Sequence, residues 1–295
     1  MEFMSQAFSE ASIIFTESWV NNNFLVIATA LFAVELIRYA FKKKLSWNMV
    51  GDSATNLITL SFLLVTIFFI GLAYVAAFTY VFDNFSLTQL PITGWSILGC
   101  LILADLAYYW EHRFFHSNGL AWGTHSVHHS SPYFNISVAY RFGPLDWFFP
   151  FFFHLPLILM GFNPFVVLLC ETLVQVFQTL LHTETVRKLP KPIEAIFNTP
   201  SHHRVHHARN TQYLDKNYAG ILIIWDRMFG TFAREEEPVK YGVYPRINSI
   251  NPFKVYFHGY TKLIKQLWQA PNWHYRFKLL VKPPVWAWKQ EQRRK

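Results

Sequence analysis

Charged residues are scarce in this chain. Asp, Glu, Lys and Arg make up only 15% of its 295 residues, whereas 52% are hydrophobic and 19% are aromatic. Soluble globular proteins carry about 25% charged residues, so this composition argues against a soluble domain and favours a membrane protein. The net charge of +8 does not indicate a nucleic-acid partner, because no basic run is interleaved with polar base-reading residues. A basic surface that faces a membrane explains the charge better.

Three further features are missing or nearly so. The two cysteines, Cys100 and Cys170, lie in apolar runs, which excludes a disulfide framework and a thiolate metal site. The sequence contains no fingerprint of a flavin, haem or nicotinamide site. Residues 1–23 contain no Lys or Arg, so they lack the basic start of a signal peptide.

Long apolar runs are abundant. They cover residues 24–41, 57–82, 95–110 and 145–181, and the run 57–82 contains no charge. A run of that length can cross roughly 30 Å of hydrocarbon. Residues 161–164 read Gly-Phe-Asn-Pro and interrupt the last run, which therefore predicts a hairpin of two spans. The sequence predicts an all-α, integral membrane helical bundle.

Lys and Arg are absent from one set of connecting segments. The predicted spans place residues 1–23, 83–94 and 161–164 on one side of the membrane, and these segments contain neither residue. Every Lys and Arg except Arg38 falls on the other side. The positive-inside rule makes that side cytoplasmic. The predicted cytoplasmic cap consists of residues 111–144 and 182–295.

Histidine is the polar residue that clusters in this chain. One HxxxH motif and two HxxHH motifs have helical spacing, which places their imidazoles on one face of a helix. Pro200 and Ser201 precede the last motif and predict a helix start there. Neutral imidazole is the commonest protein ligand for transition metals, and one ion takes about four to six ligands, so eight imidazoles imply two metals. The eight are His112, His116, His125, His128, His129, His203, His206 and His207.

Two other histidines are candidate ligands. His182 ends an apolar run on the histidine side of the membrane, and we expect it to be a ninth ligand. His202 is four residues before His206 but about 100° from His203 around a helix, so it is either a ligand or a residue that orients one.

Several polar side chains are candidates for orienting the ligands. Asp105 lies seven residues before His112, on nearly the same helix face, and a carboxylate inside a membrane is usually functional. We expect it to accept a hydrogen bond from a ligand imidazole. The lesser candidates for this role are Glu111, Asn135, Glu184 and Asp226.

The histidine motifs and several other segments resemble a known protein family. The three histidine motifs with their intervening spans resemble the fatty acid hydroxylase and sterol desaturase superfamily, from about residue 45 onward. Within it, Asn198–His207, residues 215–220 (DKNYAG) and residues 223–232 (IIWDRMFGTF) resemble the alkylglycerol monooxygenase branch. His182-Thr183-Glu184 and residues 251–255 also fit that branch. The resemblance implies that residues 1–295 form a single fatty acid hydroxylase-type domain.

The resemblance also implies a reaction. The family uses a di-iron centre and O₂ to hydroxylate or desaturate an unactivated C–H bond of a lipid. This chain is then expected to bind two iron ions and a bilayer lipid, in a bacterial inner membrane or the endoplasmic reticulum. A sterol or fatty-acyl desaturase is the alternative within the superfamily. A non-catalytic zinc-binding membrane protein would share the histidines, although transport sites usually lie at mid-membrane.

The electron donor is expected to be a separate protein, because the chain has no redox-cofactor fingerprint. The animal alkylglycerol enzymes, which the chain resembles, have an acidic residue directly after HxxxH that is associated with a tetrahydrobiopterin reductant. Ser117 occupies this position here. This departure favours a ferredoxin or cytochrome donor over the pterin.

Overall fold

Helices make up the structure of this protein, a computed structural model that describes residues 2–292. Within those residues there is no β-strand, only three isolated bridges, so the predicted all-α fold is confirmed. The α-helices and 3₁₀-helices (η) in chain order are α1 (Glu2–Ser5), α2 (Glu10–Phe41), α3 (Trp47–Phe85), α4 (Gly94–Ser117), α5 (Gly119–His128), η1 (Ile136–Tyr140), α6 (Phe149–Leu159), α7 (Pro164–Leu181), α8 (Lys191–Ile196), α9 (Pro200–His206), η2 (Thr211–Tyr213), α10 (Ile224–Met228), α11 (Pro252–Tyr256), α12 (His258–Gln269), α13 (Trp273–Val281) and α14 (Pro284–Gln292).

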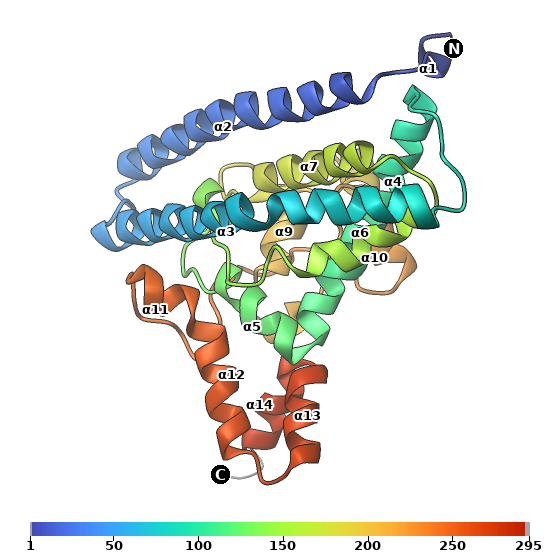
Figure 1. The fold of residues 1–295 in the computed structure, drawn as a ribbon. Coiled ribbons are helices and arrows are strands. Elements are labelled where there is room, and N and C mark those ends of the chain that lie inside the picture. The colour runs from blue at the N-terminus through green and yellow to red at the C-terminus, as the bar shows by residue number, and fades with distance from the viewer. Residues whose placement is uncertain (1, 293–295) are drawn as a thin grey trace.

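Three described helices are long and apolar enough to cross a membrane: α2, α3 and α7. Figure 1 shows α2 along one side of the molecule, with α12, α13 and α14 projecting from the opposite side. Phe68 and Leu72 in α3 are each 81% exposed, as expected for side chains that face hydrocarbon. The predicted spans 24–41 and 57–82 lie within α2 and α3.

Helix α2 begins well before the predicted span. The Ser9 side chain accepts a hydrogen bond from the Ser12 backbone N–H and caps the helix, which continues without a break through residues 10–23. Glu17 in this extension accepts a hydrogen bond of 3.0 Å from Thr172 on α7. The N-terminal extension is therefore a helical arm packed on α7, and not a loop.

The predicted hairpin forms, but its arms are unequal. Helices α6 and α7 are joined through Gly161, whose φ of +99° favours glycine, and Pro164 begins α7. Helix α6 has 11 residues and is about 17 Å long, which is too short to cross a bilayer alone. It starts late because Gly143 and Pro144 form a turn, in which Asp146 accepts a hydrogen bond from the Gly143 N–H.

The predicted span 95–110 is part of the longer helix α4. This helix is not among the three described helices that meet the length and hydropathy of a span. Polar residues occupy its second half, where Asp105, Glu111, His112 and His116 are all buried within the protein. Helix α4 packs on α6 and α7, so its polar side chains avoid hydrocarbon.

The three segments without Lys or Arg meet at one end of the molecule. The Phe8 N–H donates to the Ile92 carbonyl at 2.7 Å, and the Leu87 N–H donates to the Leu159 carbonyl at 2.8 Å. The Leu90 N–H donates to the Gly161 carbonyl at 2.9 Å. This grouping agrees with the predicted order of the spans, while the side of the membrane that it faces stays a prediction.

The C-terminal helices cover the segment that carries the second histidine motif. Helices α12 and α13 pack on α5. The approach is closest at Gly259, where a Cβ atom would overlap the Gly123 carbonyl oxygen of α5. These helices therefore hold α5, and the histidines on it, against α4.

Candidate metal centre

Four chain segments bring nine histidines together. Helix α4 supplies two, α5 and its C-cap supply three, the C-cap of α7 supplies one, and α9 with its C-cap supplies three. The predicted start of α9 at Pro200 is confirmed, but the capping residue is different. Thr199 occupies the N-cap, while the Ser201 hydroxyl donates instead to Glu194 at 2.7 Å.

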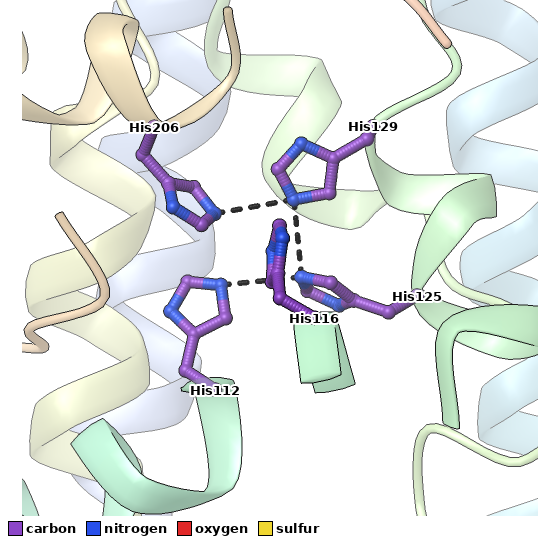
Figure 2. A group of neighbouring side chains, drawn as sticks. All are labelled: His112, His116, His125, His129 and His206. Carbon is purple, nitrogen blue, oxygen red and sulfur yellow. Dashed lines mark hydrogen bonds between the residues drawn. The ribbon is translucent and has the colours of Figure 1, made fainter. Parts of the chain in front are cut away.

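The nine histidines form two groups, which we call site A and site B. In each group, one nitrogen from every ring lies within 4.8 Å of those from the others. Figure 2 shows the rings of site A around a common centre. Site A consists of His112, His116, His125, His129 and His206, and site B consists of His128, His182, His203 and His207.

Each HxxHH motif contributes to both sites. The first and last histidines of a motif share one site, and the middle one faces the other site. His125 and His129 thus belong to site A and His128 to site B, whereas His203 and His207 belong to site B and His206 to site A. Positions i+3 and i+4 differ by about 100° around a helix, and this difference separates the two centres.

Backbone carbonyls fix the tautomers of three rings. The Nδ1 atoms of His112, His182 and His206 lie 2.9, 2.8 and 3.0 Å from the carbonyl oxygens of Tyr218, Gln178 and Lys216. A carbonyl only accepts, so each Nδ1 carries the proton and each Nε2 has a free lone pair.

The free nitrogens point at one another. In site A the His112–His125, His125–His129 and His129–His206 pairs have Nε2 atoms 3.1 Å apart. In site B the corresponding separations run from 3.0 to 3.2 Å. The His116 Nε2 atom in site A is buried without a hydrogen-bond partner. Converging lone pairs repel each other and a cation satisfies all of them, so this donor set fits a metal ion in each site.

Burial lowers the pKa of every histidine in both sites. The pKa falls to about 4 for His112 and to about 3 for His182. In the other seven the neighbouring imidazoles add to burial, and the pKa lies well below its usual value. The rings are therefore neutral near pH 7, in the form that binds metals.

His202 is separate from both sites. It is buried, but its ring packs on Phe232 with 5.4 Å between ring centroids. Its backbone carbonyl accepts a hydrogen bond from Asn217 at 3.0 Å. His202 was predicted to be either a ligand or a residue that orients one, and this placement disagrees with direct ligation.

Asp105 was predicted to accept a hydrogen bond from a ligand imidazole, but its partners are different. Its carboxylate accepts hydrogen bonds from the backbone N–H of Ile221 and Leu222, and from the Trp225 indole at 2.9 Å. The side chain points at the loop that follows the third motif, and not at an imidazole. Asp105 therefore acts one step further from the metal than expected, by anchoring this loop.

Asp226 holds the same loop. It accepts hydrogen bonds from the backbone N–H groups of Tyr218 and Ala219, both at 2.8 Å, and from the Thr231 hydroxyl. The Tyr218 carbonyl is the partner of His112 Nδ1. Asp226 thus orients a ligand through one residue of backbone, as a residue that supports a metal site does.

The other three predicted residues do not hydrogen-bond to a ligand imidazole. Asn135 caps η1 by accepting from Ser137, and Glu184 is exposed and accepts from the Tyr39 hydroxyl. Glu111 is buried, and its Oε2 atom has no hydrogen-bond partner. None of the three therefore orients a ligand ring by a direct hydrogen bond, and the Nδ1 atoms of His112, His182 and His206 meet backbone carbonyls instead.

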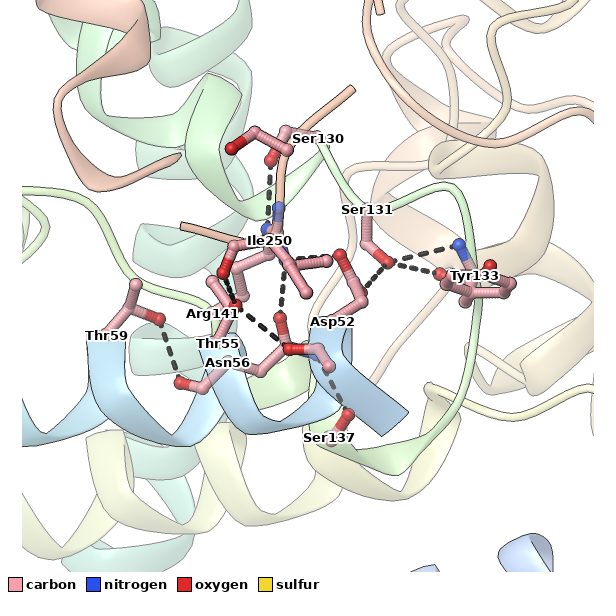
Figure 3. A network of polar contacts seen from close by, with 12 residues as sticks. Asp52, Thr55, Asn56, Thr59, Ser130, Ser131, Tyr133, Ser137, Arg141 and Ile250 are labelled. Carbon is pink, nitrogen blue, oxygen red and sulfur yellow. Dashed lines mark hydrogen bonds and ion pairs between the residues drawn. The ribbon is translucent and has the colours of Figure 1, made fainter. Parts of the chain in front are cut away.

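A buried ion pair holds the second motif in place, and sequence reasoning missed it. Arg141 pairs with Asp52 of α3 at 2.9 Å and also donates to the Val127 carbonyl, within the motif, and to Ser130. Figure 3 shows this network between α3 and the end of α5. The Asn56 side chain accepts a further bond from Arg141. Nothing in the spacing of Asp52 and Arg141 signals that they meet.

A small cavity adjoins both sites. Its volume is about 80 Å³, and His112, His125, His128 and His182 form part of its wall. Residues of α4, η1, α6 and α7 form most of the remaining wall. A small apolar group placed here would lie beside both sites.

Parts of this chain are similar to known proteins. Residues 97–231 match the family model described as fatty acid hydroxylase. This segment is similar to the fatty acid hydroxylase family. Alkylglycerol monooxygenase of Danio rerio is 41% identical over 213 residues, and that of Homo sapiens is 39% identical over 212. Each alignment covers 72% of this chain and 47% of the relative.

A bacterial lipid hydroxylase is also similar to this chain. Ornithine lipid hydroxylase of Rhizobium tropici is 33% identical over 151 residues, which is 51% of this chain and 45% of that protein. The chain spans about half the length of these curated relatives. No solved structure matches it. The matched segment, residues 97–231, contains the motifs of α4 and α5, His182 and the third motif, so it includes all nine histidines.

Proposed function

We propose that this protein is a membrane-bound, O₂-dependent lipid hydroxylase whose sites A and B each hold one iron ion. One observation carries the proposal: two adjoining, all-imidazole sites lie beside a cavity whose wall includes α7, a helix long and apolar enough to cross a membrane. The hydroxylase names of the relatives support the reaction class. We also propose that residues 1–295 act as one domain.

The iron pair, when bound, supplies the activation of O₂ and the oxidation of a C–H bond. The chain's own residues do the rest. The nine histidines hold the ions as neutral ligands, and the Tyr218, Lys216 and Gln178 carbonyls fix three of the rings. The buried wall of the cavity keeps bulk water from the reacting carbon.

The substrate is proposed to be a lipid of the alkylglycerol kind. This follows from the names of the similar enzymes of Danio rerio and Homo sapiens. The cavity of about 80 Å³ admits only a few atoms, so the hydrocarbon tail must lie between the membrane helices. Hydroxylation of the carbon next to the ether oxygen would give a hemiacetal, whose C–O bond then breaks to release an aldehyde and a glycerol. A desaturase would instead remove two hydrogens.

Lipid mass spectrometry tests this function. Cells that express the active protein should contain lipids that have gained one oxygen, or the aldehyde that follows ether cleavage, and a His125→Ala variant should show neither. Loss of two hydrogens would identify a desaturase instead. Purified protein that binds zinc and oxidises no lipid under O₂ and reductant would refute the enzyme.

A further inference from the structure

Two residues of the cavity wall each have a buried side-chain oxygen atom without a hydrogen-bond partner. The atoms are Oε2 of Glu111 and Oε1 of Gln178, and each side chain is less than 5% exposed. Buried polar atoms are almost always paired, so two unpaired acceptors around one cavity need an explanation.

Neighbouring protein groups do not supply the missing bonds. The His154 Nδ1 atom lies 3.9 Å from Glu111 Oε2, which is too long for a hydrogen bond, and it bonds the Pro150 carbonyl at 3.0 Å. The Gln178 amide nitrogen already donates to the Ala219 and Gly220 carbonyls. Those two bonds fix the amide, so its oxygen stays directed away from them.

We propose that Glu111 and Gln178 bind a hydroxyl group of the substrate and so select lipids with a hydroxyl near the oxidised carbon. This inference rests on the proposed function and adds the residues that determine its specificity. A hydroxyl can donate to either oxygen, and it pairs with the Glu111 carboxyl in both protonation states. Four histidines of the metal sites share the same wall, which places the bound hydroxyl beside the reacting atoms.

A neutral hydroxyl fits better than an ammonium group. The cations held by sites A and B would repel a second positive charge in the adjoining cavity. Water can pair with the two oxygens before the lipid arrives. A lipid without a donor would displace this water and leave both acceptors unpaired, and such a site rejects the analogue strongly.

The test compares the binding of two lipids to iron-loaded protein without reductant, so that no turnover occurs. The probes are an alkylglycerol and the same molecule with both hydroxyls methylated, and native mass spectrometry measures retention. Wild-type protein should prefer the alkylglycerol by about 100-fold or more. Glu111→Leu should reduce this preference to below about 10-fold, and Glu111→Gln, which keeps an acceptor, should fall between.

Glu171→Gln is the matched control, because the Glu171 carboxylate influences Glu111 electrostatically but does not line the cavity. It should keep the wild-type preference, and metal content should be equal in all variants. Unchanged preference in both Glu111 variants would overturn the inference, as would equally tight binding of an alkylamine without hydroxyls. If the preference appears but no lipid is oxidised once reductant and O₂ are added, the inference stands and the proposed reaction fails.

Discussion

At the scale of single residues, backbone carbonyls orient the ligand imidazoles, a role that the sequence analysis predicted for carboxylates. Tyr218, Lys216 and Gln178 present carbonyl oxygens to three ligand rings. Every residue has a carbonyl, so no residue type marks such a position. Asp105 and Asp226 are buried, and they accept hydrogen bonds from the backbone of the loop that contains the Lys216 and Tyr218 carbonyls.

The neighbours His202 and His203 give the sharpest test at this scale. Both are buried histidines of α9, but only His203 belongs to a site. His203→Ala should weaken metal binding at site B by at least about 100-fold, because a lost ligand costs more than a lost supporting residue. His202→Ala should leave two metals per chain. Elemental analysis after dialysis measures the metal content of both variants. Loss of metal from the His202 variant would show that His202 is a ligand.

At the scale of elements, helical spacing predicted that the histidines gather, but not how they divide. The motifs at His125 and His203 were expected to place three imidazoles on one face, and a single face does not distinguish one centre from two. The division depends on where α5 and α9 lie relative to α4, which is a tertiary property. The late start of α6 could not be predicted from the sequence either, because the turn at Gly143 depends on a hydrogen bond to Asp146.

The Arg141–Asp52 pair makes a prediction about α5. Arg141→Met would leave Asp52 buried and unpaired, which costs about 3–5 kcal/mol. It would also remove the hydrogen bond from Arg141 to the Val127 carbonyl, between His125 and His128, and so lower metal content. The double variant Arg141→Met, Asp52→Leu removes both charges and should recover most of the unfolding free energy but not the metal. Denaturation in detergent and elemental analysis distinguish these outcomes. A double variant no more stable than the single one would contradict this account.

At the scale of the whole molecule, the charge asymmetry predicts the topology. Tags at the C-terminus and within residues 208–212 should face the cytoplasm, and a tag in residues 83–94 should face the opposite side. The physical reason is that the three grouped segments without Lys or Arg lie at one end of the bundle, near the start of α4. Accessibility labelling in intact cells checks this. Cytoplasmic labelling of residues 83–94 would show that the orientation is reversed.

The choice of electron donor also concerns the whole molecule, and the prediction about it depends on Ser117. Ser117 is exposed at the end of α4, where its hydroxyl donates to the Phe114 carbonyl at 3.3 Å. The carboxylate that the animal alkylglycerol enzymes have at this position could accept from a reduced pterin with charge-assisted strength, roughly twice that of a neutral bond. A serine hydroxyl is shorter and neutral, and Glu111 next to the motif lines the internal cavity instead.

Tetrahydrobiopterin should therefore support little turnover, while a reduced ferredoxin or cytochrome system should drive it. O₂ consumption by purified protein with an alkylglycerol and each donor in turn measures this. A Ser117→Glu variant should gain pterin-driven activity if the carboxylate is the missing contact. Asp215 lies 3.9 Å from the His116 Nδ1 atom and is half exposed, so its carboxylate is placed to replace that contact. Efficient pterin-driven turnover in the wild-type protein that Asp215→Asn abolishes would overturn the prediction and assign the pterin contact to Asp215.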